Sequence, residues 1–442
     1  MTEAPPPKFD VWALTGAKDL LEKQGFRRLL LSRILAQLAQ NSLFYGLFVL
    51  VAQKTDNSMF TGFLVLSFAV PSALLGPLSG VVTDRLSRGW LLVTMHGLRT
   101  LMCLGAVASD LGVWVLYLFS VALAASMQFA GPAESAALPQ VLRREELTRG
   151  NSLFNLGGFL GQAGGMAVLA PLFLKLLGAD PLFAVAGALF AVAAGVIATV
   201  SGLGPPAPSA RAGRGVRNEF ARAWYNLRND TQSYMALVIA VVGGSSIQLG
   251  VTVVPRYARE VLNISVENVV FVFWPAAIGV LLGLRTVGWL ERHVGKGRML
   301  VAGFFLLVLS FLAFGFVGSL ANMLESQNPL DLFDPGPLDN RSARILMTMV
   351  VAAVLGLAYS LVGVVTRAII NERVPVEMQG RIFAAMAVLS SLASIVPLLL
   401  VGGLVDLVGV RPILGLIAMI MLLLVFWLWW RARLIPRRPV HN

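Results

Sequence analysis

The sequence predicts an all-α membrane protein with twelve transmembrane helices arranged in two six-helix lobes. The chain has 442 residues, of which 57% are hydrophobic and only 13% are charged, and its mean hydropathy is +0.77. A soluble domain carries roughly 25% charged residues, so lipid is expected to solvate most of this chain. Its apolar runs are unbroken and lack the alternation, over about ten residues, of outer-membrane strands.

Twelve apolar runs are long enough to cross a bilayer as helices, for which about 20 residues suffice. We expect these spans at residues 29–52, 60–82, 90–109, 112–137, 150–174, 181–203, 232–255, 267–289, 298–322, 345–370, 381–404 and 411–431. A stretch rich in Pro and Arg separates the first six spans from the last six. The predicted parts are a cytoplasmic segment 1–28 with an amphipathic helix over 9–24, a lobe 29–203, a linker 204–231, a lobe 232–431 and a basic tail 432–442.

The positive charges predict the orientation. With a cytoplasmic N-terminus, most of the 35 Lys and Arg residues lie in cytoplasmic segments. Those on the opposite side are Lys54, Lys175, Arg256, Arg259, Arg341, Arg344 and Arg411. Cytoplasmic loops are enriched in Lys and Arg, so both termini are predicted to be cytoplasmic, in a bacterial inner (plasma) membrane. The same bias accounts for the net charge of +12 without a nucleic acid partner.

Several classes of function are disfavoured by missing residues. Cys103 is the only cysteine, and His96, His293 and His441 are scattered, so we expect no metal site. No Gly-x-x-x-x-Gly-Lys-Ser/Thr loop is present, which disfavours ATP-driven transport by this chain alone. No nucleophile–His–acid set is evident. The sequence therefore predicts neither an enzyme nor a cofactor.

A charged motif interrupts the apolar sequence between the second and third spans. It reads Gly80-Val-Val-Thr-Asp84-Arg85-Leu-Ser-Arg88. This pattern resembles the loop between helices 2 and 3 of major facilitator superfamily transporters, and the resemblance covers nearly the whole chain. The second half repeats the pattern weakly as Gly288-Trp-Leu-Glu291-Arg292, where Glu replaces Asp and the spacing differs by one residue, so it supports two related halves only loosely.

Two further segments resemble the branch of this family that includes macrolide-efflux and enterobactin-export proteins. One runs from Phe129 to Pro139 through Glu134, and the other is Pro375-Val-Glu377-Met-Gln-Gly380-Arg381. The fifth span carries Gly157, Gly161 and Gly165, similar to the glycine-rich motif of antiporters, although Gln162 and Met166 depart from it. Small residues at this spacing favour close helix packing.

The resemblance implies a cytoplasmic gate. Asp84 is expected to accept hydrogen bonds from the N-terminus of helix 11 near Arg381, and Arg85 and Arg88 to pair with acids such as Glu134. The alternative is a solvated turn whose basic residues only fix topology. The gate residues are Gly80, Asp84, Arg85, Arg88, Glu134, Glu291, Arg292 and Arg381.

Polar residues inside the spans predict the substrate cavity. In the first span, one helical face carries Arg33, Gln37, Gln40 and Asn41. A polar face is costly to expose to lipid, so we expect it to face a cavity or another helix; the alternative for Arg33 is that it snorkels to the interface. Arg99 lies near mid-membrane and either ties helices together or binds an anionic substrate. The full set adds residues on the helices that line the family's pathway and two neighbouring helices: Tyr45, Gln128, Asn155, Gln162, Gln248, Trp274 and Tyr359.

Carboxylates are scarce within the spans. Apart from Glu267 at the outer end of the eighth span, Glu134 is the only acid inside one, and proton coupling requires a group whose pKa changes between conformations. Glu134 is therefore the first candidate for proton coupling and Asp84 the second. The alternative for Glu134 is a structural ion pair with Arg85.

These features predict a secondary active transporter that exports a small amphipathic, neutral or anionic compound by alternating access, with proton exchange as its coupling hypothesis. The expected partners are the small-molecule substrate, membrane lipid and protons, and the expected state is a monomer. A lysophospholipid or lipid flippase of the same fold is the alternative within transport. A non-transporting membrane receptor is the alternative outside it.

Overall fold

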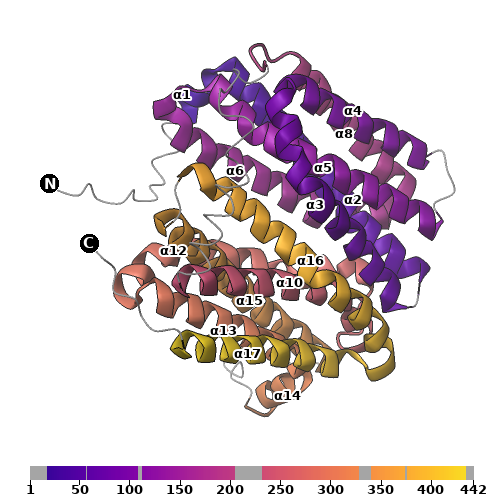
Figure 1. The fold of residues 1–442 in the computed structure, drawn as a ribbon. Coiled ribbons are helices and arrows are strands. Elements are labelled where there is room, and N and C mark those ends of the chain that lie inside the picture. The colour runs from indigo at the N-terminus through magenta and orange to yellow at the C-terminus, as the bar shows by residue number, and fades with distance from the viewer. Residues whose placement is uncertain are drawn as a thin grey trace, which may run out of the picture. The chain divides into compact units, whose positions relative to one another are not determined.

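The computed structural model describes residues 17–55, 57–107, 112–204, 231–327, 340–373 and 376–434. These residues are almost entirely helical (Figure 1). Within the described ranges, twelve segments are long and apolar enough to cross a membrane, in agreement with the predicted number of spans. The long linker predicted at 204–231 and most of the acidic loop after the ninth span lie outside the described residues.

The chain forms two compact units, and the boundary between them is not confined to the predicted linker. The first contains residues 1–50 and 74–209, and the second contains 51–73 and 210–442. One stretch of the expected N-terminal lobe 29–203, Val51–Ala73, thus belongs to the second unit. That stretch covers the end of α2 (Gln24–Lys54) and the beginning of α3 (Ser58–Arg85).

Besides α2 and the later part of α3, the first unit contains α1 and the helices from α4 to α8. Their bounds are α1 (Ala17–Glu22), α4 (Arg88–Val107), α5 (Val113–Val141), η2 (Arg144–Glu146), α6 (Leu147–Gly164), η3 (Gly165–Leu169), α7 (Ala170–Leu176) and α8 (Ala179–Ala198). The fifth span consists of α6, the π-helical turn η3 and α7. Of the predicted amphipathic segment 9–24, residues 17–22 form α1 and residue 24 begins α2, whereas residues 9–16 lie outside the described part of the chain.

The helices of the second unit follow the linker. Their bounds are α10 (Thr231–Glu260), η4 (Val266–Asn268), α11 (Val269–Phe273), α12 (Pro275–Val294), α13 (Lys296–Gly315), α14 (Val317–Gln327), α15 (Asn340–Arg373), α16 (Val376–Val408) and α17 (Val410–Leu434). The eighth span combines η4, α11 and α12. Pro275 begins α12, a position at which the missing backbone N–H is tolerated.

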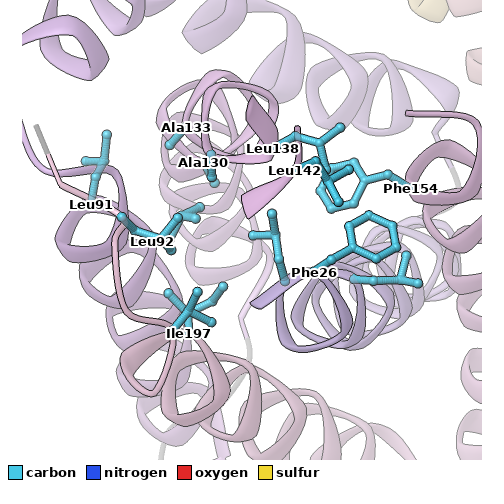
Figure 2. Close-up of a cluster of buried hydrophobic side chains, with 14 of the residues drawn as sticks. Phe26, Leu91, Leu92, Ala130, Ala133, Leu138, Leu142, Phe154 and Ile197 are labelled. Carbon is cyan, nitrogen blue, oxygen red and sulfur yellow. The ribbon is translucent and has the colours of Figure 1, made fainter. Parts of the chain in front are cut away.

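A hydrophobic cluster lies at the end of the first unit that is predicted to be cytoplasmic (Figure 2). Phe26 of α2 and Phe154 of α6 lie beside Leu138 at the end of α5, while Leu92 of α4 packs near Ile197 of α8. Each of these side chains is buried. The cluster packs the ends of α2, α4, α5, α6 and α8 together.

The predicted close packing of the fifth span is confirmed within the first unit. A Cβ atom at Gly161 would lie 2.6 Å from the carbonyl oxygen of Ile34, and one at Gly165 would collide with the carbonyl oxygen of Leu38. Only glycine permits α6 and η3 to approach the backbone of α2 this closely. The second unit has a similar crossing between α12 and α15, where Gly279 and Gly356 contact backbone atoms of the facing helix.

Candidate functional site

An ion pair lies inside the first unit between α2 and α5. The Nη1 atom of Arg33 donates a hydrogen bond to Oε2 of Glu134 at 2.5 Å. The Arg33 side chain is 18% exposed and the Glu134 side chain 6%. A carboxylate that is nearly dry is held in its charged form only by such a partner.

The same guanidinium is held by α6 on its other sides. Arg33 Nε donates to the carbonyl oxygen of Phe154 at 3.1 Å, and its Cζ atom lies 4.4 Å from the centroid of the Phe154 ring. A Cβ atom at Gly158 would lie 2.7 Å from Nε. The glycine therefore makes room for the guanidinium, and Arg33 does not snorkel away from the bundle as in the alternative derived from the sequence.

This pair corrects the expected partner of Glu134. The sequence motif suggested that Arg85 or Arg88 binds this carboxylate, but Arg33 does so instead. Arg85 is exposed at the end of α3. The expectation was wrong because Glu134 lies more than a turn before the end of α5 at Val141, and so faces the interior of the bundle.

A second arginine lies deeper in the same unit. Arg99 on α4 is only 2% exposed. Its Nε atom donates to Oγ of Ser126 at 2.7 Å, and its Cζ atom lies 5.3 Å from the ring centroid of Phe190 on α8. These contacts join α4, α5 and α8, which favours the helix-tying alternative over direct cargo binding.

His96 precedes Arg99 by one helical turn and was not predicted as part of the site. Its ring stacks on Phe190 with centroids 6.2 Å apart, and it is fully buried. Among the described residues, neither ring nitrogen of His96 nor Nη2 of Arg99 has a hydrogen-bond partner. The spacing His96-x-x-Arg99 was the available signal, because residues three apart share a helix face.

The two arginines and one carboxylate form a buried cluster of charges. Glu134 lies within Coulombic range of both Arg33 and Arg99. With all three groups charged the cluster carries one net positive charge, which is costly inside a membrane. A proton on Glu134 would increase that net charge and remove the acceptor from Arg33, so the protonation state and the position of Arg33 are linked.

The polar stripe of α2 continues one turn beyond the ion pair. Asn41 is buried, and its Nδ2 donates to the backbone oxygen of Gln37 at 2.8 Å and to its Oε1 at 3.0 Å. Tyr45, one turn further, is buried against Phe48 with ring centroids 6.4 Å apart. On the neighbouring helices, Gln128 is half-buried, and Asn155 and Gln162 are exposed.

The cavity residues predicted in the second unit differ in their surroundings. Oε1 of Gln248 on α10 accepts a hydrogen bond from Oγ of Ser394 on α16 at 2.6 Å. Trp274 and Tyr359 are both about half exposed. Gln248 is thus fixed between two helices of its own unit, whereas the two aromatic side chains extend from the surface of that unit.

The proposed gate falls partly outside the described residues. Gly80 and Asp84 lie in the last turns of α3, but the placement of the Asp84 side chain is not described, and neither is that of Arg381 on α16. The contact expected between Asp84 and the eleventh span, α16, is therefore untested. Helix α3 ends at Arg85 and α4 begins at Arg88, so only two residues separate them.

The weak repeat of the motif forms a charged group in the second unit. Lys296 at the start of α13 lies 3.1 Å from Oε1 of Glu291 and also pairs with Glu372 near the end of α15. Arg292 is exposed, and its Nε donates to the carbonyl oxygen of Gly288. Glu291 thus joins α12 to α13 within one unit, and its part in a gate remains a prediction.

A second polar cluster joins three helices at the predicted outer end of the second unit. Arg256 of α10 pairs with Asp406 of α16 and with Glu260. Oδ2 of Asp406 also accepts a hydrogen bond from the backbone N–H of Ser58 at 2.9 Å. Asp406 therefore caps the first turn of α3, where a negative charge is favourable, and it attaches that turn to the second unit.

Asp406→Ala removes both interactions of this carboxylate. We expect it to lower the free energy of unfolding by about 1–2 kcal/mol, since one helix cap and one partly buried ion pair are lost. Thermal unfolding in detergent measures the change. Glu260→Gln is the matched control, because it removes only an exposed contact to the same arginine, worth about 0.5 kcal/mol or less. Equal effects of the two variants would contradict the capping role.

In the described part of the chain, no group of three or more His, Cys, Asp or Glu side chains is placed to hold a metal ion. The single cysteine, Cys103, is buried as a free thiol.

Comparisons with known proteins agree with this architecture. The family model described as Major Facilitator Superfamily matches residues 29–326. The chain belongs to this superfamily. No curated protein sequence matches the chain.

Solved structures of the superfamily show the same fold. The crystal structure of nucleoside transporter NupG superposes with a TM-score of 0.67 at 14% identity, covering 91% of this chain and 98% of that chain. A point mutant of that transporter gives a TM-score of 0.69 at 13% identity with the same coverage. The superfamily consists of membrane transporters that bind small molecules, so this chain is an integral membrane transporter rather than an enzyme.

Proposed function

We propose that this superfamily member is a secondary active transporter that exports a small amphipathic compound, neutral or anionic, by alternating access and in exchange for protons. The observation that carries the proposal is the buried pair of Arg33 and Glu134. It supplies a carboxylate in a nearly dry site, next to polar groups that an uncharged cargo can contact. Gln37 and Asn41 provide those groups one and two turns further along α2.

The pair supports coupling because a proton changes what Arg33 can bind. While Glu134 is charged, it occupies Nη1 of Arg33. Once Glu134 is protonated, Arg33 loses its counter-ion and its position is no longer fixed by the carboxylate. A cargo that binds only the arrangement with the charged pair therefore competes with the proton, as exchange requires.

The direction and orientation of transport rest on the charge bias of the loops. We infer that both termini are cytoplasmic, that the membrane is a bacterial inner membrane and that the protein functions as a monomer. Under that orientation, the hydrophobic cluster around Phe26 and Leu138 lies at the cytoplasmic end of the first unit. Export then means that inside-out vesicles accumulate cargo when their interior is acidic.

Glu134→Gln tests the coupling role directly. The glutamine side-chain oxygen still accepts a hydrogen bond from Arg33 but cannot be protonated near neutral pH. We expect transport by the variant to lose its dependence on the pH gradient, while equilibrative exchange of cargo persists. Uptake of a panel of labelled neutral, anionic and cationic amphiphiles into inside-out vesicles, with and without a pH jump, measures this.

Glu145→Gln provides the matched control, since Glu145 is exposed just after α5 and should leave the pH dependence intact. An unchanged pH dependence in Glu134→Gln would remove this residue from coupling. A clear preference for lipophilic cations would contradict the proposed cargo. Movement of lysophospholipid between leaflets, with no uptake of the soluble amphiphiles, would favour the flippase alternative.

A further inference from the structure

The second unit contains an apolar cavity that the proposed transport cycle does not use. Its volume is about 110 Å³, and residues of α10, α11, α13, α15 and α17 line it. All of these helices belong to one compact unit, so the cavity is a property of that unit alone. The loops predict that it lies in the outer half of the membrane.

Three aromatic rings form one wall of the cavity. The centroid of Phe314 lies 5.9 Å from that of Tyr257 and 5.7 Å from that of Phe273. The hydroxyl group of Tyr257 is 3.2 Å from Oγ1 of Thr348 and shares a hydrogen bond with it. The one polar group among the lining side chains is therefore already paired, and the remaining lining residues are aliphatic, aromatic or glycine.

The cavity lies on a different face of α10 from the polar residue predicted to line the transport path. Ile247, Gly250, Val251 and Val254 line the cavity at the three- and four-residue spacing of one helix face. Gln248 does not line it and is bonded to Ser394 of α16. A molecule in the cavity would therefore contact α10 without touching Gln248.

We propose that this cavity is a binding site for a small uncharged hydrocarbon group, either a single aromatic ring or the end of an acyl chain. An apolar cavity of roughly 150 Å³ in another protein stays dry and binds benzene or xenon, and the volume here is of the same order. Because no polar group is free in the lining, charged and strongly hydrogen-bonding ligands are excluded by their desolvation cost. The aromatic wall favours a ring, which can pack edge to face against it.

Toluene is a suitable probe for the site. We expect toluene to raise the midpoint of thermal unfolding of the full-length protein in nanodiscs, because a ligand that binds only the folded state stabilises it. Xenon-pressurised crystals should show a xenon atom next to Tyr257, Phe273 and Phe314. The absence of both the thermal shift and the xenon atom would overturn the proposal.

Val254→Phe fills the cavity and should weaken toluene binding about tenfold or more, since a close-packed site leaves no volume for the ring. Val350→Phe is the matched control on α15, because Val350 is 53% exposed and does not line the cavity. If Val254→Phe fails to fold, Val251→Leu adds a smaller volume to the same wall and should give a smaller loss. Equal toluene shifts in the control and in the folded cavity variant would show that toluene acts through the bilayer, which would also overturn the proposal.

Changing the acyl-chain length of the nanodisc lipid distinguishes the two possible sources of the ligand. If a free ring compound is the ligand, the toluene shift should be the same in short-chain and long-chain phosphatidylcholine. If the end of an acyl chain occupies the site, long chains should compete and reduce the shift. Either result supports a hydrocarbon site, provided that Val254→Phe or Val251→Leu reduces the shift.

Discussion

Arg33→Met is expected to lower the free energy of unfolding by about 3–5 kcal/mol, the cost of leaving one member of a buried ion pair without its partner. Glu134 would keep its burial, with a side chain only 6% exposed, and lose its direct counter-ion. The variant would also lose the hydrogen bond to the Phe154 carbonyl and the contact with the Phe154 ring. Denaturation in detergent measures the difference from the wild type.

The double variant Arg33→Met/Glu134→Met separates the cost of an unpaired buried charge from the rest of the loss in the free energy of unfolding. Replacing both members of a buried pair by apolar side chains is often neutral or stabilising, so we expect it to be more stable than Arg33→Met alone. A double variant that is as unstable as the sum of the two single variants would indicate that packing, and not pairing, dominates this site.

Lys23→Met is the matched control for a pair at the surface. Lys23 donates to Glu146 at 2.5 Å, with side chains that are 34% and 27% exposed. This hydrogen bond lowers the pKa of the Glu146 carboxyl below its usual value, but pairs at the surface contribute little to stability because solvent screens them. A loss at Lys23 comparable to that at Arg33 would contradict the assignment of the large effect to burial.

Gly279→Ala should destabilise the second unit by about 3 kcal/mol, at the upper end of the usual cost of overpacking. A Cβ atom at this position would collide with the carbonyl oxygen of Ala353, which belongs to the backbone of α15 and cannot rotate away. The crossing of α12 and α15 is tight on both sides, since Gly356 meets the carbonyl oxygen of Ala276 in the same way. Expression, monodispersity and thermal unfolding of the variant measure the effect.

Gly288→Ala and Gly363→Ala are matched controls on the same two helices. A Cβ atom at either position has no neighbouring atom within 4 Å, and alanine favours a helix over glycine by about 1 kcal/mol. These two variants should therefore be neutral or slightly more stable. Loss of folded protein in the controls as well as in Gly279→Ala would show that the glycines serve a purpose other than close packing.

Much of the fold follows from the sequence because hydrocarbon imposes strict local rules. A spanning segment must be apolar, about 20 residues long and helical, so the twelve spans could be predicted from composition along the chain. The spacing of Gly157, Gly161 and Gly165 likewise indicated a close helix contact before its partner was known. The charged motif around Asp84 and Arg85 indicated the family, which the match to residues 29–326 confirms.

The sequence predicted which residues form the candidate site, but not which of them contact one another. Residues 33, 99 and 134 were identified because charged side chains are rare inside spans. Helical spacing placed Arg33 on a face with Gln37 and Asn41, but it carries no information about which helix lies opposite. The expected partner of Glu134 was therefore a neighbour of the conspicuous motif, and it was wrong.

The sequence alone thus determined the number of spans, their helical form and the family, since these depend on hydropathy and on spacing along one helix. Only the tertiary structure decided that Arg33 pairs with Glu134 and that Asp406 caps α3. These partners are 101 and 348 residues apart in the chain. Such contacts depend on how whole helices pack, and that packing depends on glycines and side-chain shapes of several helices at once.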